Sequence, residues 1–369
     1  MNPTNYPLKR EEEAVFALRT LYQKYGYRQF KMSKFEEYDL YVRNKDFLVS
    51  DGVITFMDTD GRLMALKPDV TLSIIKNSRD LPGCVEKLHY SENVYRISGS
   101  TRTFKEIMQT GLECIGDVDL YNLCEVVALA SESLRLIGEK HVLELSHMGV
   151  VAALVDALKL DGETRGEVLK CIGAKNADGV RKLCPGLAID GVLALIAAHG
   201  APEKVIASLR PWCVDAGAKS ALDELAAVTD MLAASGSGAD VEIDFSIVND
   251  MNYYNGIVFQ GYISGIPSCV LSGGQYDKLM QRMGRSSRAV GFALYLDLLE
   301  RLGDAPKPYD VDTVVLYDES ADVLALTRAV RMLADSGLSV AAQKAVPDKL
   351  KYRQLIRFSK GGMTLEAHD

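Results

Sequence analysis

The chain has 369 residues, 48% of them hydrophobic and 25% charged, which predicts a globular protein of two or three domains. Its formal net charge is −8. Nucleic-acid-binding modules are usually basic on one face, so nucleic acid is not expected as the main partner. No apolar run approaches the roughly 20 residues of a membrane span. Residues 1–14 lack the apolar core of a signal peptide, and we expect a cytoplasmic protein that does not contact a membrane.

The seven cysteines are scattered along the chain, and none forms a CxxC pair. This pattern is typical of reduced thiols rather than of a disulfide framework. The five histidines are equally dispersed, so the sequence contains no clustered set of zinc ligands. We therefore predict no metal site and no cofactor.

Hydrophobic periodicity and turn residues predict the elements of the first third of the chain. They are a helix over 9–25, an edge strand over 27–35, a hairpin of residues 52–57 and 62–66, a helix over 69–76, two antiparallel strands over 87–97 and 102–116, and a helix over 120–139. The hairpin turns at residues 58–61, where the sequence is Asp-Thr-Asp-Gly, a typical turn sequence.

The composition changes at residues 147–235, which are rich in Ala, Leu, Gly and Lys and predict a helical insertion. Beyond it the predicted elements are strands over 241–248, 253–263 and 267–271, a helix over 276–283, a linker at 306–308, and a tail over 309–369 in the order β-α-β-α. Strands interrupted by helices indicate the α+β class, with an antiparallel sheet packed by helices. We expect a core domain of residues 1–304 and a second domain of residues 305–369.

Two segments carry the strongest signal for function. One reads VNDMNYY over residues 248–254, and the other reads LSGGQYDKL over residues 271–279. Together they resemble the V-R-G-L-D-Y-Y and G-G-R-Y-D signatures of histidyl-tRNA synthetases. The resemblance covers roughly residues 6–302. It implies a class II aminoacyl-tRNA synthetase-like antiparallel sheet flanked by helices, with a helical insertion and a small truncated anticodon-binding-like α/β domain at the end.

The same resemblance implies a histidine-binding pocket. Asp69 and Thr71 stand where the synthetase holds the substrate ammonium, and Glu113 stands where it meets the imidazole. Arg96 matches an arginine that contacts the substrate carboxylate. The full candidate set is Asp69, Thr71, Arg96, Gln109, Glu113, Tyr253, Tyr254, Gly273 and Gly274. Three alternatives stay open: Asp69 as a helix N-cap, Glu113 and Arg96 as a structural pair, and the two tyrosines as ordinary strand packing.

The residues that the family uses for ATP chemistry are replaced. Asn249 stands at the position of the arginine that helps activate the amino acid, and Leu298 at that of the arginine that grips the γ-phosphate. Further replacements, each at a position of a family motif, are Ser98, Ile107, Gln275, Tyr295 and Asp297. Loss of a single preorganised donor costs about 2.7–4 kcal/mol of catalysis. We therefore predict that the chain has no catalytic residues and does not aminoacylate tRNA.

A synthetase-like chain that keeps the pocket acids and loses the ATP chemistry resembles one branch of the family, the regulatory subunits of ATP phosphoribosyltransferase. That resemblance implies a non-catalytic subunit that activates a short-form catalytic subunit and mediates histidine feedback inhibition in the first step of histidine biosynthesis. The implied partners are the catalytic subunit, a second copy of this chain through the class II dimer interface in a hetero-octamer, and histidine as effector, but not tRNA. The alternatives are a divergent histidyl-tRNA synthetase and a non-catalytic paralogue that binds RNA or a small molecule.

Overall fold

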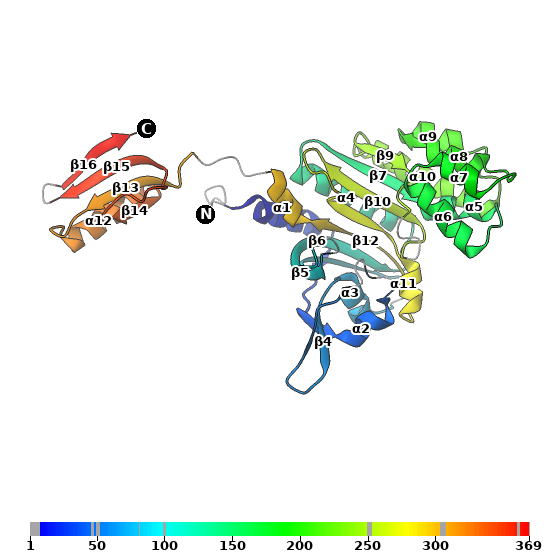
Figure 1. Ribbon diagram of the computed structural model, residues 1–369, viewed down its shortest axis with the longest axis horizontal. Coiled ribbons are helices and arrows are strands. Elements are labelled where there is room, and N and C mark those ends of the chain that lie inside the picture. The colour runs from blue at the N-terminus through cyan, green and yellow to red at the C-terminus, as the bar shows by residue number, and fades with distance from the viewer. Residues whose placement is uncertain are drawn as a thin grey trace. The chain divides into compact units, whose positions relative to one another are not determined.

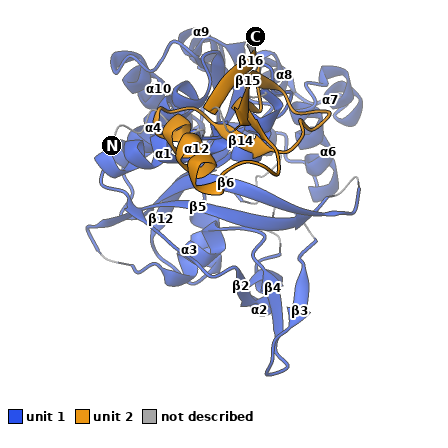
Figure 2. Cartoon of the chain, turned by 90° about the vertical axis from the view of Figure 1, so that its left-hand side faces the viewer, with its two compact units in different colours: residues 1–302 blue, residues 303–369 orange. Residues whose placement is uncertain are grey.

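The computed structural model describes residues 8–45, 48, 52–80, 82–98, 101–248, 253–302, 308–359 and 362–368. Their contacts divide the chain into two compact units, residues 1–302 and residues 303–369 (Figure 2). No helix in the described part of the chain is long and apolar enough to cross a membrane.

A nine-stranded, mostly antiparallel sheet forms the centre of the first unit (Figure 1). Its strands, in spatial order, are β1 (Arg28–Gln29), β5 (Val85–Ile97), β6 (Phe104–Gly116), β12 (Arg288–Tyr295), β11 (Leu271–Gln275), β10 (Ile257–Ile263), β7 (His141–His147), β9 (Val241–Asp244) and β8 (His199–Gly200). Only two neighbouring pairs run parallel, β1 with β5 and β7 with β9. The two long strands β5 and β6 lie side by side near one edge of the sheet and carry Arg96, Gln109 and Glu113.

Among the described residues of the first unit, five α-helices lie outside the helical segment of residues 148–234. They are α1 (Arg10–Lys24), α2 (Tyr38–Arg43), α3 (Thr71–Asn77), α4 (Leu120–Ile137) and α11 (Asp277–Arg282). Side chains alternate along each strand, so the sheet has two distinct faces. Leu112 and Cys114 of β6 join the main core together with α1 and α4. Glu113 lies between them and points to the opposite face, where α3 and α11 contribute to a second core.

Residues 148–234, all of them described, contain six helices that gather beyond one end of the sheet (Figure 1). They are α5 (Met148–Asp156), α6 (Gly162–Gly173), α7 (Ala177–Leu183), α8 (Asp190–Ala197), α9 (Pro202–Leu209) and α10 (Ala216–Ala234). Four of these helices begin at a side-chain cap: His147, Asp161, Asn176 and Asp215 each accept a hydrogen bond from a backbone N–H of the first turn.

The hairpin at residues 58–61 is confirmed, with strands β3 (Thr55–Met57) and β4 (Leu63–Leu66). Gly61 has a φ of +79°, a left-handed conformation that favours glycine at this turn. Strand β2 (Phe35–Glu37) completes a separate three-stranded sheet. The hairpin projects from the rest of the unit (Figure 1).

Other predicted elements differ from the structure. The predicted strand over 267–271 lies further along the chain, as β11, because the two glycines of LSGGQ allow close packing between β10 and β12. Within the predicted edge strand over 27–35, Arg28 and Gln29 pair with β5, and Phe35 belongs to β2 of the separate sheet. Strand β7 has no counterpart in the predicted elements. The chain leaves β12 through a 3-10 helix, η3 (Leu296–Leu302).

The second unit is a four-stranded sheet with one helix. Its elements are β13 (Val311–Tyr317), α12 (Val323–Asp335), β14 (Val340–Gln343), β15 (Tyr352–Ser359) and β16 (Gly362–His368), with the sheet order β14-β13-β15-β16. The predicted final helix of the tail is wrong, because two strands follow β14 instead. Ile356 and Phe358 are buried on either side of the exposed Arg357, an alternation that a strand requires and a helix does not.

Candidate functional site

Glu113 is the centre of the candidate pocket. Its side chain is almost fully buried, with 2% of the residue surface exposed. Thr71 Oγ1 donates a hydrogen bond to Glu113 Oε1 at 2.8 Å, and the Tyr276 hydroxyl donates one to Oε2 at 2.6 Å. Gly291 lies opposite Glu113 on β12, where a Cβ atom would come within 1.7 Å of Oε2. The glycine therefore leaves the space that the carboxyl group occupies.

No ion pair in the described part of the chain includes Glu113, so the carboxyl is a buried acid without a cation. Burial raises the pKa of Glu113 to about 8. The hydrogen bonds from Tyr276 and Thr71 lower the pKa, whereas the negative charge of the nearby Asp69 raises it. Arg96 is not its partner, because Arg96 Nε donates to the Pro68 carbonyl at 2.9 Å. The alternative of a structural Glu113–Arg96 pair is therefore wrong. A carboxyl group in this state is suited to receive a cationic ligand.

Asp69 precedes α3 and is the second acid of the pocket. Its Oδ1 accepts a hydrogen bond from the Leu72 backbone N–H at 2.9 Å, in the first turn of α3, whose N-cap residue is Val70. Burial raises the pKa of Asp69, while the Leu72 hydrogen bond and the positive charge of Arg96 lower it. A backbone hydrogen bond from Thr71 lowers the pKa of Asp69 as well.

Three tyrosines lie together beside the two acids. The ring centroids of Tyr253 and Tyr254 are 4.6 Å apart, and those of Tyr253 and Tyr276 are 5.9 Å apart. Burial raises the pKa of Tyr253, and the neighbouring Asp69 raises it further. Gly274 faces Tyr254, and a Cβ atom there would lie 2.7 Å from Tyr254 Cδ1. Residues 249–252 of this signature, including Asn249, lie outside the described residues.

Gln109 and Tyr295 form the next pair along the same face. They lie opposite each other on β6 and β12, and Gln109 is buried with 3% of its surface exposed. Burial raises the pKa of Tyr295, and the charge of Arg96 lowers it. Gly273, by contrast, belongs to the other face of the sheet, since a Cβ atom there would meet Phe292 and Phe259 in the main core. The structure therefore does not direct Gly273 toward Glu113.

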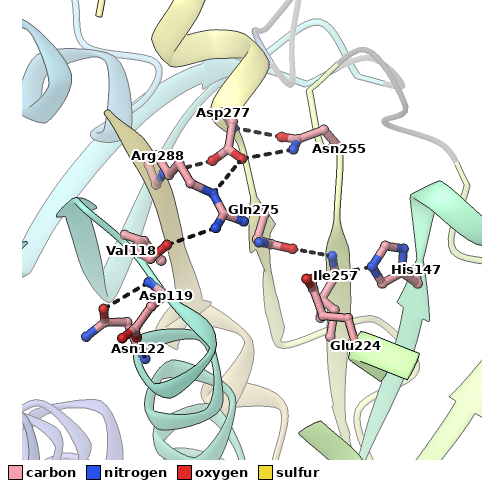
Figure 3. Close-up of polar contacts among 11 residues, drawn as sticks. Val118, Asp119, Asn122, His147, Glu224, Asn255, Ile257, Gln275, Asp277 and Arg288 are labelled. Carbon is pink, nitrogen blue, oxygen red and sulfur yellow. Dashed lines mark hydrogen bonds and ion pairs between the residues drawn. The ribbon is translucent and has the colours of Figure 1, made fainter. Parts of the chain in front are cut away.

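Two other replaced positions, Ile107 and Leu298, pack against the cores of the first unit. Ile107 packs against the second core, and Asp297 and Leu298 lie in η3 after β12. Gln275, at the position of the second signature arginine, accepts a hydrogen bond at Oε1 from the Ile257 backbone N–H at 2.7 Å (Figure 3). This side chain therefore joins two strands and does not extend toward a ligand.

Asp277, two residues beyond Gln275, holds the segment that follows the tyrosines (Figure 3). It accepts from Asn255 Nδ2 at 3.1 Å, and its own backbone N–H donates to Asn255 Oδ1 at 2.7 Å. The Ala289 backbone N–H donates to Asp277 Oδ1 at 2.9 Å, and Arg288 Nε lies 3.3 Å from Oδ2. These contacts fix α11 and β12 against the chain that leaves Tyr254.

Two residues of the pocket region are absent from the candidate set. Tyr276 bonds directly to Glu113, and its only sequence signal is its place inside the GGQYD segment. Lys67 is fully buried and forms an ion pair with Glu92, and its signal is its place in the segment over 54–76. Across the described residues, no group of three or more His, Cys, Asp or Glu side chains could hold a metal ion.

A family model described as histidyl-tRNA synthetase matches residues 5–299, which is most of the chain. The chain belongs to the histidyl-tRNA synthetase family. A solved structure from Bacillus halodurans C, titled as an ATP phosphoribosyltransferase regulatory subunit/histidyl-tRNA synthetase, superposes with a TM-score of 0.78 at 23% identity, over 94% of this chain and 93% of that one. The family match and this likeness confirm the α+β class II synthetase-like fold.

Curated relatives of the family carry a more specific name. A protein of Oceanobacillus iheyensis, named ATP phosphoribosyltransferase regulatory subunit, is 25% identical over 100% of this chain and 94% of its own length. One of the same name from Moorella thermoacetica is 29% identical over 88% of this chain and 85% of its own length. The ATP phosphoribosyl transferase (HisG:HisZ) complex from Thermotoga maritima contains a chain with the same fold, which superposes with a TM-score of 0.63 at 23% identity. The superposition covers 78% of this chain and 97% of that chain.

Proposed function

We propose that this chain is the non-catalytic regulatory subunit of an ATP phosphoribosyltransferase. The observation that carries the proposal is that relatives with this name match the chain along nearly its whole length. The replaced positions support it, because Leu298 cannot bind a phosphate and Gln275 is engaged with the Ile257 backbone. The chain keeps a pocket for a small cation and lacks the arginines that the family uses to act on ATP.

The ligand of the pocket is histidine, the effector of feedback inhibition. Glu113 receives the imidazolium, and Asp69 with Thr71 receives the ammonium. Arg96 receives the ligand carboxylate, and the strand register, which puts Arg96 on the same face of the sheet as Glu113, supports this role. The remaining members of the proposed site are Gln109, Tyr253, Tyr254 and Gly274. Support comes from the complementary groups: the buried Glu113, the partly buried Asp69 and one arginine match the two cationic groups and the one anionic group of histidine.

Regulation is allosteric in this proposal. Histidine shifts the complex toward an inhibited arrangement, and it does so only by binding that arrangement more tightly than the active one. Two copies of the chain pair through the class II interface and carry short-form catalytic subunits in a cytoplasmic hetero-octamer. Residues 1–304 form the synthetase-like core with its insertion at about 147–235, and residues 305–369 form the anticodon-binding-like domain.

The test is an activity assay with a short-form catalytic subunit, with and without the full chain. The proposal predicts that the chain activates ATP phosphoribosyltransferase turnover. It also predicts no histidine-dependent ATP–pyrophosphate exchange by the chain alone. Exchange without activation would instead identify a divergent histidyl-tRNA synthetase. A chain that does neither and retains an RNA or another small molecule would be a binding paralogue.

A further inference from the structure

Lys67 is a lysine without solvent contact, since 0% of its surface is exposed. Its Nζ donates to Glu92 Oε2 at 2.6 Å, and the Glu92 side chain is largely buried. Burying two charges is costly, and apolar residues of similar size often serve the fold as well as a buried ion pair. A buried ion pair two residues before Asp69 therefore calls for a role other than stability.

The ion pair is one of three connections between residues 67–68 and strand β5. The Tyr95 backbone N–H donates to the Lys67 carbonyl at 2.9 Å, and Arg96 Nε donates to the Pro68 carbonyl at 2.9 Å. With the pair to Glu92, these connections span five consecutive residues of the strand. The short segment before α3 is thus held along β5 by both backbone and side-chain contacts.

Strand β5 in turn is in register with the strand that carries the central acid. Glu92 lies opposite Gln109 on β6, and Leu88 lies opposite Glu113. Asp69 and Thr71 are two and four residues beyond Lys67, and Thr71 reaches Glu113 Oε1 at 2.8 Å. The position of these two ligand groups relative to Glu113 therefore depends on how residues 67–68 are held on β5.

We propose that the Lys67–Glu92 ion pair is a positioning pair, which holds Asp69 and Thr71 at the distance from Glu113 that the ligand requires. The role in ligand affinity rests on the proposed function, whereas the effect on the Thr71–Glu113 contact does not. Neither Lys67 nor Glu92 needs to touch the ligand.

The same strand provides a matched control. Lys87, also on β5, forms an ion pair with Glu125 of α4 at the same distance of 2.6 Å, and both side chains are largely buried. Lys87 lies opposite Cys114, which belongs to the main core on the other face of the sheet. Lys67→Met and Lys87→Met thus remove equivalent cations, one beside the pocket and one behind it.

The experiment measures histidine affinity of the full chain by calorimetry, together with the titration of Glu113 by carbon-13 NMR. Lys67→Met is expected to weaken histidine binding by about 10- to 100-fold, the effect of losing one hydrogen bond to a charged group. Lys87→Met should leave it within about twofold, as for an independent site. A double variant, Lys67→Met with Glu92→Gln, leaves no unpaired charge in the interior and should show the same loss while remaining folded.

Wild-type affinity in Lys67→Met and in the double variant would overturn the proposal. If the wild-type chain binds no histidine, the proposed ligand is wrong. The titration of Glu113 then tests by itself whether Lys67 positions Thr71. The Thr71 hydrogen bond lowers the pKa of Glu113. Its loss in Lys67→Met should therefore raise the titration midpoint, with no change in Lys87→Met. An unchanged midpoint in Lys67→Met would contradict the positioning role.

Discussion

Thr71, the first residue of α3, donates a 2.8 Å hydrogen bond to Glu113, which lies 42 residues further along the chain on β6. Tyr276 donates to the second oxygen of the same carboxyl group. Both donors are neutral hydroxyl groups, so they orient the acid without supplying a charge. The pocket therefore presents a positioned acid whose ionised form a cationic ligand would favour.

The first prediction concerns the loss of that acid. Glu113→Gln keeps the shape of the side chain and removes its ability to ionise, so histidine affinity should fall by about 10- to 100-fold. Calorimetry on the full chain measures this directly. Glu106→Gln is the control, because Glu106 is an exposed acid on the same strand that bonds to Tyr95. Equal affinities for the two variants would remove Glu113 from the site.

The second prediction is a pH dependence of stability in the absence of ligand. The pKa of Glu113 is raised from its ordinary value of 4.5 to about 8 in the folded chain. Between these values the folded state holds a proton that the unfolded state has lost, so this group lowers stability as pH rises. Glu113→Gln lacks the effect. Its melting temperature relative to wild type should rise from pH 5 to pH 8, and a constant difference would contradict the raised pKa.

The third prediction uses the glycine beside the tyrosines. Gly274→Ala places a Cβ atom 2.7 Å from Tyr254 Cδ1 and 2.8 Å from the Ile257 carbonyl, closer than such contacts allow. Overpacking of this kind costs about 1–3 kcal/mol and should displace the Tyr254 ring. We expect a lower melting temperature together with weaker histidine binding. Gly166→Ala on α6 is the control, since a Cβ atom there has no neighbour within 4 Å.

The fourth prediction tests the contacts of Asp277. Asp277→Ala leaves the Ala289 N–H and the Asn255 amide without their acceptor, and should destabilise the chain by about 3 kcal/mol, as expected for hydrogen bonds to a charged group. Urea unfolding gives the value. Asp178→Ala removes an acid from an exposed helical ion pair with Arg181 and should cost less than about 1 kcal/mol. Similar losses for both variants would mean that the Asp277 contacts contribute little.

Local signals predict the parts of this fold that local contacts determine. The turn at residues 58–61 is an example, because an Asp-Thr-Asp-Gly sequence between alternating strands needs no distant partner. The tail shows the opposite case. The sequence predicts a final helix, whereas β15 pairs with β13 across more than 30 intervening residues. A partner that distant is not visible in the periodicity of either segment.

The candidate site also contains residues that the sequence predicts and residues that only the structure shows. The resemblance to synthetase segments predicts Asp69, Thr71 and Glu113, and the structure brings Thr71 and Glu113 into contact. It does not predict Tyr276, whose hydroxyl reaches Glu113 only because the chain turns from β11 into α11. Nor does it predict that Gly273 lies on the other face of the sheet, which follows from the register of β11 with β12.

The central claim is that histidine regulates a catalytic subunit through this pocket. The most direct measurement is a histidine titration of ATP phosphoribosyltransferase activity in the assembled complex, with wild-type chain and with a double variant, Asp69→Ala with Glu113→Ala. The account predicts that the wild-type chain activates the catalytic subunit and that histidine reverses the activation. The variant should still activate but respond only at much higher histidine concentrations. A variant complex inhibited at the same histidine concentration as wild type would contradict the account.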